Sequence, residues 1–383
     1  MTVLAAAALV IWLYLVVAHG GFWRATERDD RGAPPDPGAW PDIVAIVPAR
    51  DEADVIAHSL GSLLGQDYPG SLEVVLIDDQ SRDGTAAVAH KAASDLGAAD
   101  RLTIVPGRTP PSGWAGKVWA MRQGVEHVAS LAEPPRYLLF TDADIAYDKD
   151  ALKPLVARAE AGRLALASLM VKLRCETLPE RAFIPAFIFF FQMLYPFAWV
   201  NRRDRATAAA AGGCMLVRRE ALETAGGIDA IRGALIDDCA LGRNLKRAGP
   251  IWLGLTERVH SLRAYPRVGD IRRMVARSAY TQLGHSPLLL AGTILGLALT
   301  YLVPPLTAFA GTGVARVPGI LAWALMAIAF QPTLRLYRLS PLWGLALPAI
   351  ALVYMAFTLD SAYQHARGRG GLWKGRVADV STR

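Results

Sequence analysis

The chain has 383 residues, of which 53% are hydrophobic, and carries a formal net charge of +7 at pH 7. This length allows a full α/β domain with a sizeable core and additional elements. The absence of any DNA- or RNA-reading motif argues against a nucleic-acid partner, and arginines beside apolar segments explain the positive charge through contacts with anionic lipid.

The first predicted element is a membrane-spanning helix over residues 1–23, because residues 3–23 are almost continuously apolar. This run lacks the charged start and the small-residue cleavage site of a secretory signal peptide. Arg24, Arg28 and Arg31 follow it, and the positive-inside rule places the chain after them on the cytoplasmic side. Residues 24–41 are rich in Pro, Gly and Asp, which predicts a linker.

Residues 43–161 alternate between short β-branched runs and segments with helical apolar spacing. This alternation predicts a parallel sheet with helices on both faces. Ligands bind beyond the carboxyl ends of the strands in such sheets, so acidic residues at those ends predict a site. Any one of these acidic residues could instead cap a helix, and the same alternative holds for Asp83, just before a predicted helix. The acidic groups that follow successive predicted strands are Asp51 and Glu52, Asp78 and Asp79, and Asp142 and Asp144.

The last of these groups ends the stretch YLLFTDAD, residues 137–144. Alternation along a strand would place the side chains of Asp142 and Asp144 on one face. Two ionised carboxylates about 4 Å apart repel by roughly 4 kcal/mol at an effective dielectric constant near 20. Protonation, solvent, a basic partner or a bound cation must offset this repulsion, and a solvated strand end with a cap is the simplest alternative.

Two segments after the predicted sheet have surfaces suited to a membrane interface. Residues 183–200 are aromatic, aliphatic and interrupted by proline, which indicates either core burial or an interfacial element that admits a lipid. Residues 266–284 predict an interfacial amphipathic helix, with apolar side chains on one side and arginines near the other. A core-facing helix is the alternative for this second segment.

Residues 285–363 predict about three transmembrane segments, at 287–309, 318–330 and 342–359, and residues 364–383 form a basic tail. The middle segment is short enough to be re-entrant or tilted. Arg335 and Arg338 agree with a cytoplasmic loop if both preceding segments cross. Three crossings would then place the basic tail outside, so the number of spans stays open.

Four motifs, in order, resemble those of the family-2 inverting glycosyltransferases, which have the GT-A fold. They are VPARDEADVI (47–56), VVLIDDQSRDGT (74–85), FTDADIAY (140–147) and a stretch from GGCMLVRREALETAGGID to LIDDCALGRNL (212–245). The resemblance covers residues 41–263 and implies a Rossmann-like, nucleotide-sugar-binding catalytic domain, which we predict over 42–265. Further similarity, in GWAGKVWAMRQGV (113–125), HSP (285–287) and GRGGLWKGR (368–376), is to the hopanoid-biosynthesis-associated subgroup, related to ceramide glucosyltransferases.

The resemblance implies a donor-binding role for each matching residue. Asp142 and Asp144 match the DxD element, which holds Mg²⁺ or Mn²⁺ against the donor diphosphate, and such hard cations prefer carboxylate and phosphate oxygens. Lys117 matches a lysine near the donor phosphates, with an exposed lysine at a helix start as the alternative. The residues expected near the nucleotide are Asp51 and Glu52, and Asp79 is expected to hydrogen-bond the base, which we expect to be uracil. Asp78 is the structural member of its pair.

The same resemblance implies that Asp238 is the base that takes the acceptor hydroxyl proton, while Asp237 orients the site. In-line attack on the anomeric carbon requires a carboxylate opposite the leaving diphosphate. The choice between the two aspartates stays open, and an acidic helix start favoured by the macrodipole is the alternative for either. Gly212 and Gly213 would let the backbone pass close to the sugar or acceptor, unless they form a simple turn.

The processive polysaccharide synthases of this family carry a Gln-x-x-Arg-Trp element. Here Met274, Arg277 and Ser278 stand in those places, so only the arginine is kept. This departure argues against a processive polymerase and leaves Arg277 as a diphosphate contact.

The predicted function is therefore a multi-pass enzyme of the inner membrane that moves one sugar from a UDP-sugar to a lipid hydroxyl at the cytoplasmic face. The subgroup resemblance implies that this lipid is a hopanoid. The cysteines form neither a zinc pattern nor a disulfide framework, which fits a reduced cytoplasm; they are Cys175, Cys214 and Cys239. One alternative is a polyprenyl-phosphate acceptor, which needs little help from a base. Another is a non-catalytic lipid-binding protein with a degenerate transferase domain.

Overall fold

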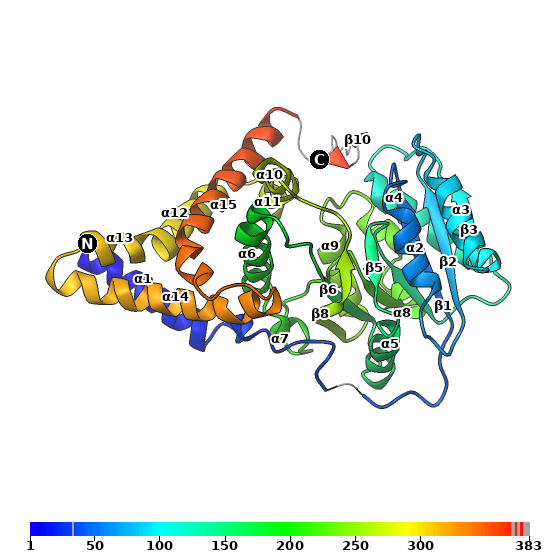
Figure 1. Cartoon of the computed structure of the whole chain (residues 1–383), viewed down its shortest axis with the longest axis horizontal. Coiled ribbons are helices and arrows are strands. Elements are labelled where there is room, and N and C mark those ends of the chain that lie inside the picture. Colours follow the sequence, from blue (N-terminus) through cyan, green and yellow to red (C-terminus); the bar gives the residue numbers. More distant parts are fainter. Residues whose placement is uncertain (33, 369–371, 374–375, 378–383) are drawn as a thin grey trace. The chain divides into compact units, whose positions relative to one another are not determined.

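The computed structural model describes residues 1–32, 34–368, 372–373 and 376–377, and the chain divides into two compact units. The first, which we call the sheet unit, consists mainly of Glu27–Arg174 and Trp199–Arg263. The second, the helical unit, consists of Met1–Thr26, Cys175–Ala198 and Ala264–Gly371. Figure 1 labels the elements of both units.

An eight-stranded sheet forms the centre of the sheet unit. Its strand order is β3 (Leu102–Pro106), β2 (Leu72–Asp78), β1 (Ile43–Ala49), β4 (Tyr137–Phe140), β7 (Met215–Arg218), β6 (Leu166–Lys172), β8 (Ile251–Ser261) and β5 (Ile145–Tyr147). The predicted parallel pairing is confirmed for β1 to β4, and β6 pairs with β8 in parallel. However, β7 runs antiparallel to β4 and β6, and β5 runs antiparallel to β8, so the sheet is mixed.

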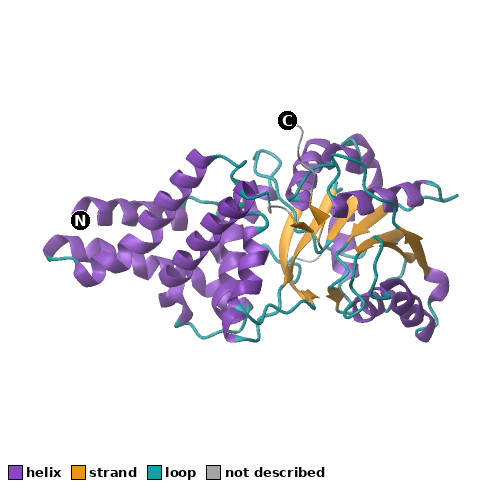
Figure 2. Ribbon diagram, turned by 90° about the horizontal axis from the view of Figure 1, so that it is seen from above, coloured by secondary structure: helices purple, strands orange, loops and turns teal. Residues whose placement is uncertain are grey.

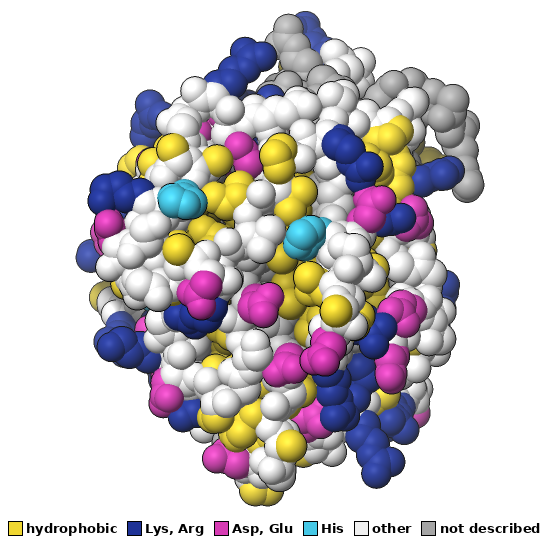
Figure 3. Space-filling model, turned by 90° about the vertical axis from the view of Figure 1, so that its right-hand side faces the viewer, with side chains coloured by type: hydrophobic (Ala, Val, Ile, Leu, Met, Phe, Trp, Pro, Cys, Tyr) yellow, Lys and Arg dark blue, Asp and Glu magenta, His cyan; other side chains and the backbone are white. Residues whose placement is uncertain are grey.

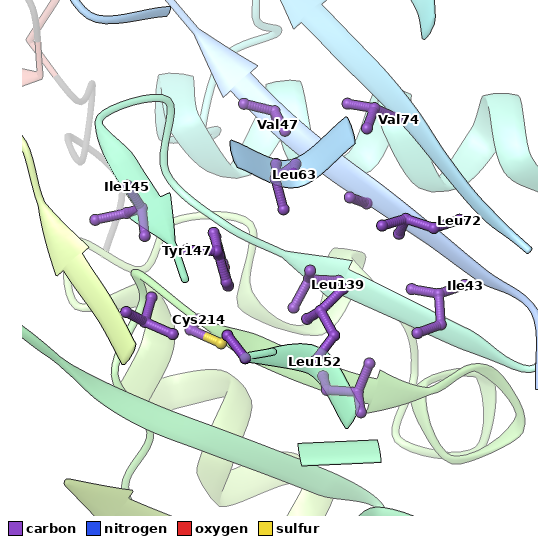
Figure 4. Close-up of a cluster of buried hydrophobic side chains, with 14 of the residues drawn as sticks. Ile43, Val47, Leu63, Leu72, Val74, Leu139, Ile145, Tyr147, Leu152 and Cys214 are labelled. Atoms are coloured by element: carbon purple, nitrogen blue, oxygen red, sulfur yellow. The ribbon is translucent and has the colours of Figure 1, made fainter. Parts of the chain in front are cut away.

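Helices flank the strands of the sheet unit (Figure 2). They are α2 (Ile56–Leu64), α3 (Thr85–Asp95), α4 (Gly116–Ala129), α5 (Leu152–Ala161), α8 (Arg219–Thr224) and α9 (Asp237–Ala248), with the short turns η2 (Ala99–Arg101) and η3 (Ile228–Ile231). All seven residues of β1 are buried, as expected for a central strand covered on both faces. Figure 4 shows side chains of β1, β2, β4, β5, α2 and α5 meeting in one apolar core.

The prediction that Asp142 and Asp144 lie on one face of a strand is wrong. Strand β4 ends at Phe140, and residues 141–144 turn the chain into β5. The Ile145 N–H donates to the Asp142 carbonyl (3.3 Å), and the Thr141 hydroxyl donates to the Gly213 carbonyl (2.8 Å). The turn is necessary because β5 leaves β4 and pairs with β8 instead.

Part of the predicted linker also belongs to the sheet unit. The Asp29 N–H donates to the Leu255 carbonyl (3.0 Å), and the Leu255 N–H donates to the Glu27 carbonyl (2.8 Å). The Asp29 side chain is buried and accepts a hydrogen bond from the Thr256 hydroxyl (2.7 Å). The Pro- and Gly-rich composition of this segment gave no sign of that pairing.

The helical unit contains α1 (Thr2–Val17), α6 (Leu178–Leu194), α10 (Val268–Ala276), α11 (Ala279–Gln282), α12 (Pro287–Leu297), α13 (Val303–Ala310), α14 (Arg316–Leu336) and α15 (Trp343–Ala366). Its short turns are η1 (Phe22–Arg24), the π-helical η4 (Ala298–Leu302) that joins α12 to α13, and η5 (Gly313–Ala315). Helix α7 (Phe197–Val200) crosses the boundary between the units, and β9 (Leu372–Trp373) pairs antiparallel with β10 (Arg376–Val377).

Buried aromatic side chains form the core of the helical unit, among them Trp12, Phe189, Tyr301, Phe330 and Tyr354. The Trp12 indole N–H donates to the Thr300 carbonyl (2.8 Å), which joins α1 to η4. The apolar face predicted for residues 266–284 lies in this core, since Ile271 and Val275 are buried there. That face is therefore used for packing against protein.

In the described part of the chain, four helices are long and apolar enough to cross a membrane: Leu178–Val200, Pro287–Ala310, Arg316–Leu336 and Trp343–Ala366. The last three extend the predicted segments, and the short middle one becomes a 21-residue helix. Helix α1 has only 16 residues, fewer than the about 20 that a span needs. Of the predicted basic tail, residues 369–371, 374–375 and 378–383 lie outside the described residues.

The first of these helices cannot make a single crossing. It lies between β6 and β7, which are hydrogen-bonded neighbours in one sheet. One crossing would put the two strands on opposite sides of the bilayer. The segment Leu178–Val200 therefore enters and leaves on the same side, whatever its hydropathy.

Candidate active site

Lys117 lies at the centre of the candidate site. Its ammonium group is 2.7 Å from Asp142 Oδ1 and 3.2 Å from Asp237 Oδ2. These side chains come from the first turn of α4, the β4–β5 turn and the first turn of α9. The lysine side chain is only 19% exposed, so the alternative of an exposed lysine at a helix start does not hold.

Asp238, the predicted base, is held by two backbone amides. The Gly212 N–H donates to Oδ2 (3.0 Å) and the Cys239 N–H donates to Oδ1 (2.7 Å). A Cβ atom at Gly212 would lie 3.3 Å from Lys117 Nζ and 3.5 Å from Asp238 Oδ2. The backbone at Gly212 therefore closes one side of the carboxylate and lysine cluster, where a side chain would crowd it.

The electrostatics of the cluster distinguish its aspartates. Burial raises the pKa of Asp238 to about 6, and repulsion from Asp237 adds to the rise while Lys117 opposes it. Burial also raises the pKa of Asp142, with Lys117 opposing and Asp144 adding. For Lys117, burial acts to lower the pKa, but Asp142 and Asp237 outweigh it and raise the pKa. A carboxylate that titrates near neutral pH suits a general base.

Asp144 points away from this cluster, into a second ion-pair group. The Arg263 Nε donates to Asp144 Oδ2 (2.7 Å), and its Nη2 donates to Glu52 Oε2 (2.7 Å) and Oε1 (3.0 Å). Glu52 is buried, so the arginine neutralises a carboxylate that has little access to water. Sequence reasoning did not single out Arg263. The sequence feature that could have identified Arg263 is its position two residues after the long strand β8.

The other acidic residues at the strand ends lie in local contacts. Asp51 has a positive φ of 50°, and its Oδ1 accepts from the Arg82 N–H (2.8 Å). Asp78 Oδ1 accepts from the Ser81 N–H (3.1 Å), as expected of a structural residue. Asp83 accepts from the Thr85 N–H (3.0 Å), but the N-cap residue of α3 is Gly84, so Asp83 stabilises the turn before the helix and the cap alternative is wrong.

Asp79 is fully buried, and its Oδ2 lies 3.7 Å from Arg50 Nη1. A nucleotide base could reach this carboxylate only after neighbouring side chains move. Its predicted contact with the base therefore stays a prediction. Arg277, at the C-terminal end of α10, belongs to the helical unit, and its predicted contact with the diphosphate also stays a prediction.

The donor set suits a divalent cation that is completed by substrate. Asp142 and Asp144 offer hard carboxylate oxygens. Within the described ranges, no group of three or more His, Cys, Asp or Glu side chains is arranged to hold a metal. Mg²⁺ is commonly bound through one or two carboxylates plus substrate phosphates, so Asp142 alone fits this mode of binding, and Asp144 could join it only after leaving Arg263.

Away from the candidate site, the charged side chains do not form a patch of a single sign on the face that Figure 3 shows. Figure 3 shows basic and acidic side chains interspersed over one face of the molecule. A nucleic-acid interface would instead show a basic patch, so this face gives no support for one.

Comparisons with known proteins agree with the resemblance. The family model of glycosyl transferase family 2 matches residues 44–226, and that of glycosyl transferase family group 2 matches residues 137–359. A 4,4'-diaponeurosporenoate glycosyltransferase of Staphylococcus aureus (strain MRSA252) is 32% identical over 115 residues, which are 30% of this chain and 27% of that protein. The match thus spans about a quarter of that relative.

Among solved structures, the mannosyltransferase PcManGT from Pyrobaculum calidifontis, in complex with GDP-Man and Mn²⁺, superposes with a TM-score of 0.54 at 21% identity. The superposition covers 94% of this chain and 99% of that one. At this identity the likeness is one of fold, and it confirms the predicted GT-A class.

Proposed function

Because the chain belongs to glycosyl transferase family group 2, we propose that it is a membrane-bound inverting glycosyltransferase that moves one sugar from a nucleotide-diphosphate sugar to a lipid hydroxyl. The observation that supports this most is the convergence of Asp142 and Asp237 on Lys117, beside Asp238. Such a cluster combines a phosphate-binding cation with a carboxylate that titrates near neutral pH.

In this proposal, some residues of the cluster bind the donor diphosphate and another activates the acceptor hydroxyl. Asp142 and Asp144 would hold Mg²⁺ or Mn²⁺, which neutralises charge on the departing diphosphate. Lys117 adds a fixed positive charge at the same place. Asp238 takes the proton of the acceptor hydroxyl as that oxygen attacks the anomeric carbon opposite the diphosphate. Asp237 orients Lys117 through their ion pair.

The nucleotide is assigned to the carboxyl ends of β1 and β2, where ligands bind in sheets of this kind. Asp51 and Glu52 would lie near it, and Asp79 would reach the base after rearrangement. Arg277 would contact the diphosphate. The fold neighbour named above was solved with GDP-Man and Mn²⁺, which supports a nucleotide-sugar donor and a divalent cation without choosing the base. We retain a UDP-sugar as the expected donor.

The apolar helices of the helical unit support a lipid acceptor and a membrane location. The relative named for 4,4'-diaponeurosporenoate is consistent with an apolar acceptor. The finer sequence resemblance favours a hopanoid or a lipid made beside it. We place the sheet unit at the cytoplasmic face of the inner membrane, because its free cysteines fit a reduced cytoplasm.

The decisive experiment compares total lipid extracts from cells that carry the wild-type gene, Asp238→Asn or Asp95→Asn. Asp95 lies on the surface of α3 in an exposed pair with Lys91, which makes it a matched control. Membranes then receive labelled UDP-sugars with Mn²⁺. We expect one glycolipid to fall by about a hundredfold or more in Asp238→Asn, as loss of a general base predicts, and to persist in the control.

Other results would redirect the proposal. A glycolipid that falls only slightly in Asp238→Asn would favour a polyprenyl-phosphate acceptor, because a phosphate oxygen needs little deprotonation. Unchanged lipids, with no metal-dependent sugar transfer from any donor, would leave the non-catalytic lipid-binding protein as the better explanation.

A further inference from the structure

A basic pocket lies in the sheet unit, away from the candidate active site. Its volume is about 370 Å³, and it opens between the C-terminal end of α9, the start of β8 and the segment that follows α7. Asp238 is in the first turn of α9 and Arg247 in the last, so about 14 Å of helix separates the two sites. The pocket thus cannot belong to the reacting centre.

The pocket carries an excess of positive charge. Four basic residues line it: Arg202, Arg203, Lys246 and Arg247. Arg202 pairs with Asp204 (Nε to Oδ1, 2.9 Å). Over the described part of the chain, no carboxylate lies within ion-pair distance of the other three. The macrodipole of α9 favours cations at its C-terminal end, but it does not explain Arg203, which comes from another segment.

The walls of the pocket are fixed by buried and half-buried contacts. Lys246 donates to the carbonyls of Val200 (2.8 Å), Thr207 (2.5 Å) and Trp199 (3.3 Å), so all three of its N–H donors hold this segment. The Asn201 side chain makes two hydrogen bonds with the backbone of Leu253 in β8. Its Nδ2 donates to the Leu253 carbonyl (3.1 Å), and its Oδ1 accepts from the Leu253 N–H (2.7 Å). Arg203 and Arg247 are exposed on this rigid frame, and their guanidinium groups remain available for a ligand.

Guanidinium groups without carboxylate partners match the geometry of phosphate, which they bind through paired hydrogen bonds. The volume is that of ordinary small-ligand pockets. The source of the phosphate follows from the chain itself, because the apolar segment Leu178–Val200 ends at a residue that lines the pocket. Both ends of that segment lead into one sheet, so Val200 and Arg203 stay on the side of the bilayer where the sheet unit lies.

We propose that this pocket binds the phosphate group of an anionic membrane lipid, and that it fixes the sheet unit at the bilayer surface. The proposal does not depend on the assigned reaction, since the pocket and the cluster around Lys117 share no residue.

The test is a calorimetric titration of the full chain in neutral detergent with dioctanoyl phosphatidylglycerol, dioctanoyl phosphatidylcholine and inorganic phosphate. The variants are Arg203→Ala and Arg247→Ala. The matched control is Arg243→Ala, one turn earlier on α9, exposed but outside the pocket. We expect phosphatidylglycerol to bind most tightly, and each pocket variant to weaken it by about tenfold, as loss of a charge-assisted hydrogen bond implies. The control should bind like the wild type.

Three results would overturn the proposal. If Arg243→Ala weakened phosphatidylglycerol binding as much as the pocket variants do, the binding would depend on general surface charge and not on the pocket. Unchanged binding in both pocket variants would remove the pocket from the interaction. Inorganic phosphate that binds as tightly as phosphatidylglycerol, with the same losses in the variants, would replace the lipid with a soluble phosphate compound.

Discussion

At the scale of single residues, the raised pKa of Asp238 predicts a pH profile. Burial raises this pKa from 3.8 to about 6, so the side chain is increasingly protonated as the pH falls through that value. A general base acts only in its ionised form. We expect kcat to rise with pH and to level off above about 6.

The profile is measured as sugar transfer by wild type and Asp238→Asn at saturating donor. The acid limb should disappear in the variant, whose residual rate has no carboxylate to titrate at this position. A wild-type rate that is level through pH 6 would contradict the assignment of Asp238 as the base.

Arg263 is the second residue whose role can be tested alone. Arg263→Ala leaves Asp144 and the buried Glu52 without their shared cation, and an unpaired buried group costs about 1–3 kcal/mol. We expect a lower midpoint of thermal unfolding in detergent, and restoration of most of it by the further change Glu52→Gln. Lys91→Ala breaks an exposed pair and should change stability by no more than about 0.5 kcal/mol. If Arg263→Ala behaves like this control, the triad is not a stabilising contact.

The candidate site was predictable where chemistry and chain position coincide. Lys117, Asp142 and Asp237 each lie at a strand end or helix start, and the structure brings them together. Arg263 was missed because its function depends on β5 pairing with β8, which joins residues 145–147 to 259–261. The mutual positions of Asp142 and Asp144 were predicted wrongly for the same reason, since the β4–β5 turn sends them to different cations.

At the scale of elements, the turn before β7 contains two glycines that should respond differently to alanine. A Cβ at Gly213 would come within 2.8 Å of Val171 Cγ1, in the core, and overpacking of this kind costs about 1–3 kcal/mol. A Cβ at Gly212 would instead approach Lys117 Nζ at 3.3 Å. We expect Gly213→Ala to lower stability, and Gly212→Ala to lower transfer with a smaller loss of stability.

Thermal unfolding and initial rates of transfer, measured on the same two preparations, separate these effects. Equal losses of stability with equal losses of activity would mean that both glycines serve the turn alone, which is the alternative that the sequence left open.

The sequence predicted those elements of the fold whose pattern lies within a short stretch of the chain, and it missed those that depend on distant partners. The β1 and β2 runs and the helices between them follow from periodicity within a few residues. The antiparallel placement of β7 and β5 depends on partners far along the chain, so no local pattern showed it. The sequence showed residues 183–200 as interrupted by proline, yet Pro185 is accommodated inside α6, and a capping box at Thr177 and Glu180 starts this helix.

At the scale of the whole molecule, the sheet constrains how the chain can meet a membrane. Hydropathy alone makes Leu178–Val200 a candidate span. Its flanking strands β6 and β7 share hydrogen bonds, and these bonds forbid a single crossing. The helices Pro287–Ala310, Arg316–Leu336 and Trp343–Ala366 carry no such constraint, because no strand of the eight-stranded sheet follows them. The hydrogen bonds between β6 and β7 therefore decide whether Leu178–Val200 crosses the membrane once, which composition alone leaves open.

This constraint predicts a pattern of labelling with an impermeant maleimide. In a chain whose three cysteines are replaced, we place single cysteines at the exposed positions Glu133 and Ala206, before and after Leu178–Val200, and at Thr312 and Ser340, on either side of α14. Glu133→Cys and Ala206→Cys should react from the same side, in inverted vesicles and not in intact spheroplasts. Thr312→Cys and Ser340→Cys should react from opposite sides if α14 crosses. Opposite reactivity of the first pair would mean that β6 and β7 do not pair in the membrane-bound protein, and the sheet itself would then have to be reconsidered.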